Sequence, residues 1–128
     1  MVIEFVLDAS AVLARLHDEP GAEIVRAALP TACMSAVNYA EAISKLIDEG
    51  LPFAEAGNVI DRLYCEVIEA DKSRSALVGS MQDATRRTRV SMGDRFCLQL
   101  GRELGVPVLT TDRRWKDLDV GVEVVVIR

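Results

Sequence analysis

Apolar and polar positions along the chain alternate between two patterns, one typical of strands and one typical of helices. Short apolar runs rich in β-branched residues, such as the run at residues 2–7, indicate buried strands. Between them lie longer stretches with helical spacing, which residues such as Ser35, Gly50 and Gly105 begin or end. The pattern predicts strands at about 2–7, 31–34, 67–68, 106–110 and 122–127, and helices at about 8–16, 20–28, 35–49, 52–63, 72–88 and 91–104.

Strands that alternate with helices through short connections predict an α/β fold with a mainly parallel sheet. We expect a single domain over residues 1–128. In the helix at about 35–49, apolar residues at i, i+4, i+7 and i+11 predict one buried face. That face consists of Ala36, Ala40, Ile43 and Ile47.

The composition is that of a globular chain. Of its 128 residues, 50% are hydrophobic and 27% are charged, which is enough for a core without disulfides. Charged residues interrupt every apolar run before the roughly 18 residues that a membrane helix needs. No basic segment precedes the apolar run near the N-terminus. We therefore expect a cytoplasmic protein with no membrane segment and no signal peptide.

The cysteines and the single histidine exclude several kinds of site. Cys33, Cys65 and Cys97 include no close pair, which argues against disulfides and against a zinc knuckle. We expect them to be small buried hydrophobes. His17 lies beside Asp18 in a predicted turn, so we expect a surface residue rather than part of a catalytic relay or metal site.

Charge is distributed unevenly along the chain. The net charge is −5, but residues 1–71 hold 13 acidic and 4 basic residues, whereas residues 72–128 hold 7 acidic and 11 basic residues. Because salt screens charges beyond about 8–10 Å, a polyanion responds to the local field more than to the net charge. The basic second half is therefore compatible with nucleic acid, and solvated helix faces are the ordinary alternative.

Four carboxylates occupy positions where α/β proteins place their chemistry. Asp8 and Asp112 each follow a predicted strand, and ligands bind at the carboxyl ends of parallel strands. Asp94 lies in the first turn of a predicted helix, and Glu41 lies further along another. We expect all four side chains to converge at one end of the sheet.

Each of these acids also has an ordinary structural explanation. Asp8 can cap a helix, Asp94 can form a capping box with Ser91, and Asp112 can be a turn residue. Glu41 can pair with the lysine four residues later. A cluster of all four would be costly without a cation, because like charges repel. Oxygen ligands favour Mg²⁺ or Mn²⁺, which can activate water for phosphodiester hydrolysis.

Other α/β folds fit the residues less well. A phosphate-binding loop needs glycines after the first strand, where this chain has Asp8-Ala9-Ser10. An aspartate-dependent phosphatase would have a second aspartate in place of Ser10. A receiver domain of phosphorelay signalling fits the length and the acids, but it would have adjacent acids after the first strand. That non-nuclease module is the alternative from another functional class.

The chain resembles the PIN-domain ribonucleases, and more narrowly the VapC toxins of type II (VapBC) toxin–antitoxin pairs. Four segments carry the resemblance in family order across nearly the whole chain. They are VLDASAVLARLHDEPGAE at 6–23, MSAVNYAEAISKL at 34–46, SMGDRFCLQLGRELG at 91–105 and PVLTTDRRW at 107–115.

The resemblance implies a PIN-like three-layer α/β/α fold around a central four- to five-stranded, mainly parallel sheet. It also implies a homodimeric toxin that cleaves RNA with Mg²⁺ or Mn²⁺ and is blocked by a cognate VapB-type antitoxin. The acids of the family match Asp8, Glu41, Asp94 and Asp112, and its small hydroxyl positions match Ser10 and Thr110.

We expect Asp8 and Asp94 to hold the main metal, with Glu41 and Asp112 completing the site. Many relatives have a further Asp or Asn after the last motif, where this chain has two arginines before Asp117, so the number of metals stays open. Trp115 can stack on a base or pack in the core. The expected contacts to the RNA backbone are Arg95, Arg113, Arg114 and Lys116.

Overall fold

The computed structural model describes residues 2–128 and contains one five-stranded sheet. The strand order is β3-β2-β1-β4-β5, and every neighbouring pair is parallel, which confirms the predicted α/β class. Because all strands run in one direction, their carboxyl ends meet at the same edge of the sheet. The strands are β1 (Phe5–Leu7), β2 (Ala32–Ser35), β3 (Glu66–Ile68), β4 (Val108–Thr110) and β5 (Val124–Val126).

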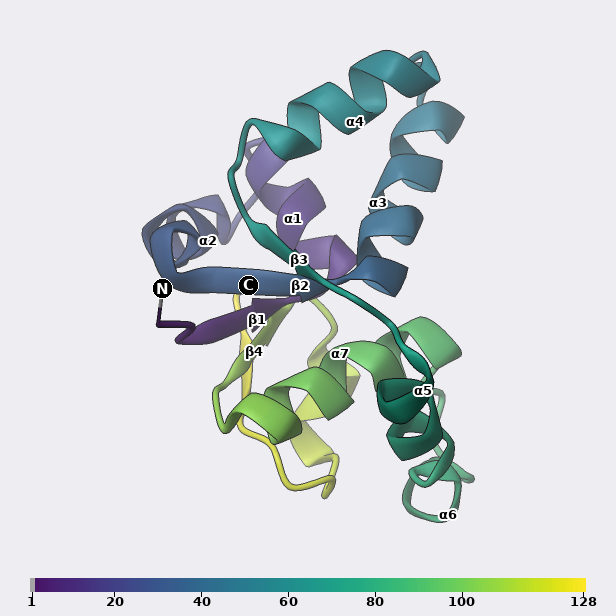
Figure 1. The fold of residues 1–128 in the computed structure, drawn as a ribbon. Coiled ribbons are helices and arrows are strands. Elements are labelled where there is room, and N and C mark those ends of the chain that lie inside the picture. The colour runs from purple at the N-terminus through teal and green to yellow at the C-terminus, as the bar shows by residue number, and fades with distance from the viewer. Residues whose placement is uncertain (1) are drawn as a thin grey trace.

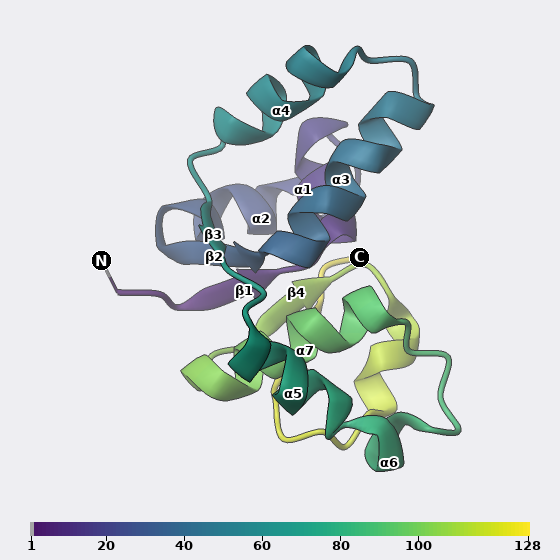
Figure 2. The same cartoon turned by 45° about the vertical axis from the view of Figure 1, so that its right-hand side comes forward.

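Helices cover both faces of the sheet and make three layers, as the family resemblance implied (Figures 1 and 2). The first four helices pack on one face, and the last three lie on the other. The α-helices are α1 (Ala9–Leu16), α2 (Ala22–Ala28), α3 (Ala36–Asp48), α4 (Phe53–Asp61), α5 (Lys72–Gly79), α6 (Gln82–Thr85) and α7 (Met92–Leu104). Two short 3₁₀ helices, η1 (Leu29–Thr31) and η2 (Arg113–Asp117), complete the fold.

The central strands divide their side chains between two cores. Leu7 and Leu109 belong to the cluster under α1–α4, whereas the preceding residues, Val6 and Val108, belong to the cluster under α7. This follows from the alternation of side chains along a strand. Both faces of β1 and β4 are therefore buried, which explains their continuous apolar runs.

The prediction of one continuous helix at 72–88 is wrong. The structure has two shorter helices there, separated at Ser80 and Met81, and the Ser80 hydroxyl donates to the carbonyl of Leu77. The break lets Met81, which is 2% exposed, pack in the cluster under α7. A polar segment with few apolar positions has no stripe that would favour one straight helix.

The predicted buried face of α3 is partly wrong: Ala36 is partly buried and Ile43 packs partly buried against the core, but the other two residues are exposed. Ala40 is exposed and Ile47 is 44% exposed, whereas the buried positions are Asn38, Ala42 and Leu46. The buried residues do have helical spacing, but one of them, Asn38, is polar. The apolar pattern alone therefore indicated the neighbouring face.

Cys33 and Cys97 are buried, as expected, and Cys65 is partly buried; all three are free thiols. His17 lies between α1 and α2, where its Nε2 is 2.9 Å from Oε1 of Glu49. Within residues 2–128, no helix has the length and apolar character needed to span a membrane.

Two helical glycines give opposite predictions for stability. At Gly101 in α7, an added Cβ would lie 2.5 Å from Cγ1 of Val108 and 2.8 Å from Cγ2 of Val122, whereas at Gly57 in α4 it would meet no atom within 4 Å. Gly101→Ala should lower the free energy of unfolding by about 1–3 kcal/mol. Gly57→Ala should raise it by up to about 1 kcal/mol. Urea denaturation measures both, and the same sign for the two variants would contradict this packing.

Candidate active site

A cavity of about 720 Å³ lies at the carboxyl edge of the sheet, between the two helical layers. Its walls come from the end of β1, the start of α1, the helix α3, the start of α7 and the residues after β4. The structure brings together in this one cavity the four acids that the sequence singled out: Asp8, Glu41, Asp94 and Asp112. Ser10 also lines it.

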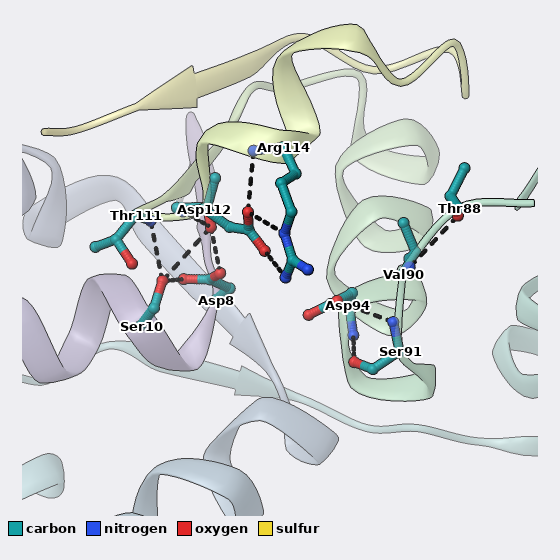
Figure 3. Close-up of polar contacts among 10 residues, drawn as sticks. Asp8, Ser10, Thr88, Val90, Ser91, Asp94, Thr111, Asp112 and Arg114 are labelled. Carbon is teal, nitrogen blue, oxygen red and sulfur yellow. Dashed lines mark hydrogen bonds and ion pairs between the residues drawn. The ribbon is translucent and has the colours of Figure 1, made fainter.

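Asp8 is the most buried of these acids, with 6% of its surface exposed. Its Oδ2 accepts from the Thr110 hydroxyl at 2.6 Å, and its Oδ1 accepts from the Ser10 hydroxyl at 2.7 Å and from the Ala11 amide at 2.8 Å (Figure 3). Burial raises the pKa of Asp8 to about 6, and the three hydrogen bonds oppose that rise. The carboxylate is therefore fixed in place by β4 and by the first turn of α1.

The hydroxyls of Ser10 and Thr110 join the ends of two strands. Ser10 accepts from the Thr111 amide at 3.0 Å, and Thr110 accepts from the Asp112 amide at 3.0 Å. Each hydroxyl thus donates to Asp8 and accepts from the backbone after β4 (Figure 3). These contacts fix the turn that carries Asp112 relative to Asp8.

Asp94 is held at the first turn of α7 by the predicted capping box. Its amide donates to the Ser91 hydroxyl at 3.1 Å, and its Oδ2 accepts from the Ser91 amide at 2.9 Å (Figure 3). The positive end of the helix dipole favours an anion at this position. The structural explanation of Asp94 is confirmed, and the same side chain still lines the cavity.

Glu41 is positioned by two residues that the sequence analysis did not select. Asn38, which is 1% exposed, donates from Nδ2 to Oε1 of Glu41 at 2.7 Å and to the Gly93 carbonyl at 3.1 Å. A Cβ added to Gly93 would lie 2.6 Å from Cδ of Glu41. The missing side chain at Gly93 therefore makes room for the Glu41 carboxylate beside Asp94. The sequence did contain a signal, because Asn38 lies four and eight residues before the buried Ala42 and Leu46 and so shares their face of α3.

The Oδ1 atom of Asn38 is buried and has no hydrogen-bond partner within residues 2–128. Buried polar atoms are nearly always paired, so this unpaired acceptor, on a residue that lines the cavity, is an exception.

Asp112 is paired with Arg114, a contact that the sequence did not predict. The Arg114 Nε donates to Oδ1 at 2.9 Å, its Nη2 donates to Oδ2 at 2.6 Å, and its backbone amide donates to Oδ1 at 3.0 Å (Figure 3). These hydrogen bonds lower the pKa of Asp112. The Arg114 side chain is 62% exposed, so its guanidinium faces solvent at the edge of the cavity.

The remaining predicted RNA contacts lie outside the cavity wall. Arg95 donates from Nη1 to Oε1 of Gln82 at 2.9 Å, and Arg113 donates from Nε to the Arg128 carbonyl at 3.1 Å. Lys116 is exposed, whereas Trp115 is 2% exposed and packs in the core under α7. Asp117 is exposed and does not line the acidic cavity.

The donor set fits a hard divalent cation. The four carboxylates are oxygen ligands, the kind that Mg²⁺ and Mn²⁺ favour. In the part of the chain that the structure describes, no three acidic, histidine or cysteine side chains form a compact metal-binding group. The acids instead surround a cavity that has room for water. This suits Mg²⁺ in particular, since it keeps several of its waters in proteins.

Known proteins share the sequence pattern of this chain. The family model of the PIN domain matches residues 5–121. Ribonuclease VapC42 of Mycobacterium tuberculosis and VapC ribonuclease Mb2780c of Mycobacterium bovis are each 30% identical to the chain, over 81% of the chain and 87% of the relative.

Solved structures share the fold at low sequence identity. DNA-bound VapBC from Salmonella typhimurium matches with a TM-score of 0.72 at 17% identity, covering 97% of this chain and 98% of that chain. FitAcB from Neisseria gonorrhoeae matches with a TM-score of 0.66 at 20% identity, covering 94% of this chain and 95% of that chain.

The raised pKa of Asp8 predicts a pH-dependent stability in metal-free buffer. The folded state binds a proton more tightly than the unfolded state, so this group's contribution to stability is lost as the pH rises from about 4 through about 6. Asp8→Asn should therefore be more stable than the wild type by about 1–3 kcal/mol at pH 7, and this difference should shrink toward pH 4. Urea denaturation in EDTA across this range measures it.

Asp119→Asn, at an exposed position outside the cavity, is the matched control. A gain in Asp8→Asn that is the same at pH 4 and pH 7 would show that the charge of Asp8 is not its cause.

Proposed function

Because this chain belongs to the PIN-domain family, we propose that it is a Mg²⁺- or Mn²⁺-dependent endoribonuclease and the toxin of a VapBC toxin–antitoxin pair. The observation that carries the proposal is the convergence of four carboxylates in one cavity at the carboxyl edge of the sheet. Relatives named as VapC ribonucleases support it. The family match over residues 5–121 argues against the receiver-like alternative.

In this proposal, Asp8 and Asp94 hold the cation, and Glu41 and Asp112 complete the site directly or through water. A bound divalent ion activates water and stabilises charge on the scissile phosphate and the leaving oxygen. The protein's contribution is to hold the carboxylate ligands in fixed positions before the ion binds. Thr110 fixes Asp8 through a hydrogen bond of 2.6 Å, so this ligand needs no rearrangement before it binds.

The substrate backbone would be held by basic residues beside the acids. Arg114 lies at the edge of the cavity with an exposed guanidinium, which can contact a phosphate oxygen while it stays near Asp112. Arg95, Arg113 and Lys116 are further candidates, because they lie close in sequence to the acids in the basic second half. Such contacts give affinity and position but little sequence information.

We also propose a VapB-type antitoxin as the inhibitor of this site and a homodimer as the toxin's assembly. Structural neighbours described as VapBC complexes support the antitoxin. The acidic cavity favours a basic segment, and exposed apolar side chains nearby offer contacts for an amphipathic helix. These side chains are Ile47 on α3, at 44% exposure, and Phe53 at the start of α4, at 72%.

The central test is RNA cleavage by charge-neutral variants of the acids. Asp8→Asn and Asp94→Asn should keep the fold and lose cleavage, because each keeps the shape of the side chain but removes a charged metal ligand. The measurement is degradation of a total RNA substrate with Mg²⁺ or Mn²⁺, with EDTA as the metal-free control and Asp119→Asn as the matched control variant. Full activity of Asp8→Asn would contradict the proposed assignment of Asp8 as a metal ligand.

The contact between Gly93 and Glu41 predicts a loss of metal affinity on adding one methyl group. Gly93→Ala should displace the Glu41 carboxylate and weaken Mn²⁺ binding by about tenfold or more. Calorimetric titration with Mn²⁺ measures this directly and needs no RNA. Gly79→Ala, where an added Cβ meets nothing within 4 Å, is the control. Equal Mn²⁺ affinity in both variants would show that Glu41 does not contribute to the metal site.

The proposed antitoxin predicts a conditional growth phenotype. Expression of the chain alone should arrest growth, and co-expression with a small protein encoded beside it should restore growth and yield a complex that co-purifies. Asp8→Asn should be harmless and should still form the complex. Harmless expression of the wild-type chain, without a small partner, would contradict the toxin–antitoxin assignment.

A further inference from the structure

A second cavity, of about 280 Å³, lies next to the acidic one and shares one lining residue with it. Asp112 lines both cavities, and Arg114, which is bonded to Asp112, lines the second. The other lining residues are Thr88, Arg89, Val90, Trp115, Asp117 and Leu118.

Each of the two segments that form this cavity lies close in the chain to a predicted metal ligand. Residues 88–90 precede the capping box that holds Asp94, and η2 begins immediately after Asp112. Figure 3 shows Thr88 and Val90 on the α7 side of the site and Arg114 on the η2 side. A group bound here is therefore next to any phosphate held by the acids.

The lining combines an apolar floor with polar groups at the rim. Val90 is 8% exposed, Trp115 is 2% exposed, and Leu118 is partly buried, so these side chains form an apolar floor. Arg89 and Asp117 are exposed residues at the rim and supply a hydrogen-bond donor and an acceptor. Pockets for small ligands combine mostly apolar walls with a few polar groups in this way.

We propose that this second cavity binds the nucleobase next to the scissile phosphate and thereby gives the enzyme a preference for that base. The inference rests on the proposed function, since it takes RNA as the substrate. The faces of the base pack on Val90 and Leu118, the Asp117 carboxylate accepts from N–H groups of the base, and Arg89 donates to its carbonyl or ring nitrogen. Arg114, between the two cavities, contacts the phosphate that joins them.

The test is nucleotide binding in EDTA, without metal and without cleavage. The four nucleoside 5′-monophosphates and ribose 5-phosphate are titrated into the wild-type chain by calorimetry. Trp115 is the only tryptophan of the chain, so its fluorescence reports whether the bound group lies in this cavity. At least one nucleotide should bind more tightly than ribose 5-phosphate and change the emission of Trp115.

Matched variants locate the binding site. Asp117→Ala and Arg89→Ala should each weaken the preferred nucleotide by about tenfold, because each removes a charged hydrogen-bond partner. Asp119→Ala and Arg87→Ala, at exposed positions nearby that do not line the cavity, should bind like the wild type. The proposal is overturned if no nucleotide binds better than ribose 5-phosphate, or if Asp117→Ala and Asp119→Ala bind equally.

A failure of the nuclease proposal would be recognised separately, as wild-type protein that does not cleave RNA with Mg²⁺ or Mn²⁺. If the wild type does cleave, Asp117→Ala should change the preferred base beside the cut. Unchanged cut sites in this variant would overturn the base cavity while leaving the nuclease assignment intact.

Discussion

The burial of the Asp8 carboxylate at the end of β1 is the constraint on which the rest of the site depends. A buried anion is costly unless hydrogen bonds or a cation compensate it. Here the compensation comes from Thr110 on β4 and from Ser10 and Ala11 in the first turn of α1. Sheet order, helix start and turn geometry must all be correct for these groups to meet, so one side chain ties the layers of the fold to the chemistry proposed for it.

The structural and functional explanations of the acids are not alternatives. Asp8 is the N-cap of α1, Asp94 completes the capping box of α7, and Asp112 is the N-cap of η2. The free amides and the dipole at a helix start favour an anion, and capping fixes the side-chain rotamer. Capping therefore brings three carboxylates to one cavity in defined orientations and partly offsets their mutual repulsion. Glu41 is not a cap and needs Asn38 and Gly93 instead.

The sequence predicted the order of strands and helices and the edge at which the acids meet. Those features depend on local apolar patterns and on one rule about parallel strands. It did not predict the buried face of α3, because Asn38 is polar and its partner, the Gly93 carbonyl, lies 55 residues away. The break at Ser80 and the pairing of Arg114 with Asp112 were also missed. The break depends on the tertiary packing of Met81 under α7. The pairing joins residues only two positions apart, but an apolar pattern does not indicate which partner an exposed arginine takes.

The hydrogen bond between Thr110 and Asp8 joins residues 102 positions apart in the chain. During synthesis, Thr110 and Asp112 follow Asp8 only after β2, β3 and all seven α-helices of residues 2–128 have been made. The strand that completes the site, β4, pairs with β1 from the far end of the chain, and such non-local pairings form slowly. A growing polypeptide on the ribosome therefore cannot assemble this cavity until β4 has emerged. In a toxin that degrades RNA, this order would protect the message and the ribosome that are producing it.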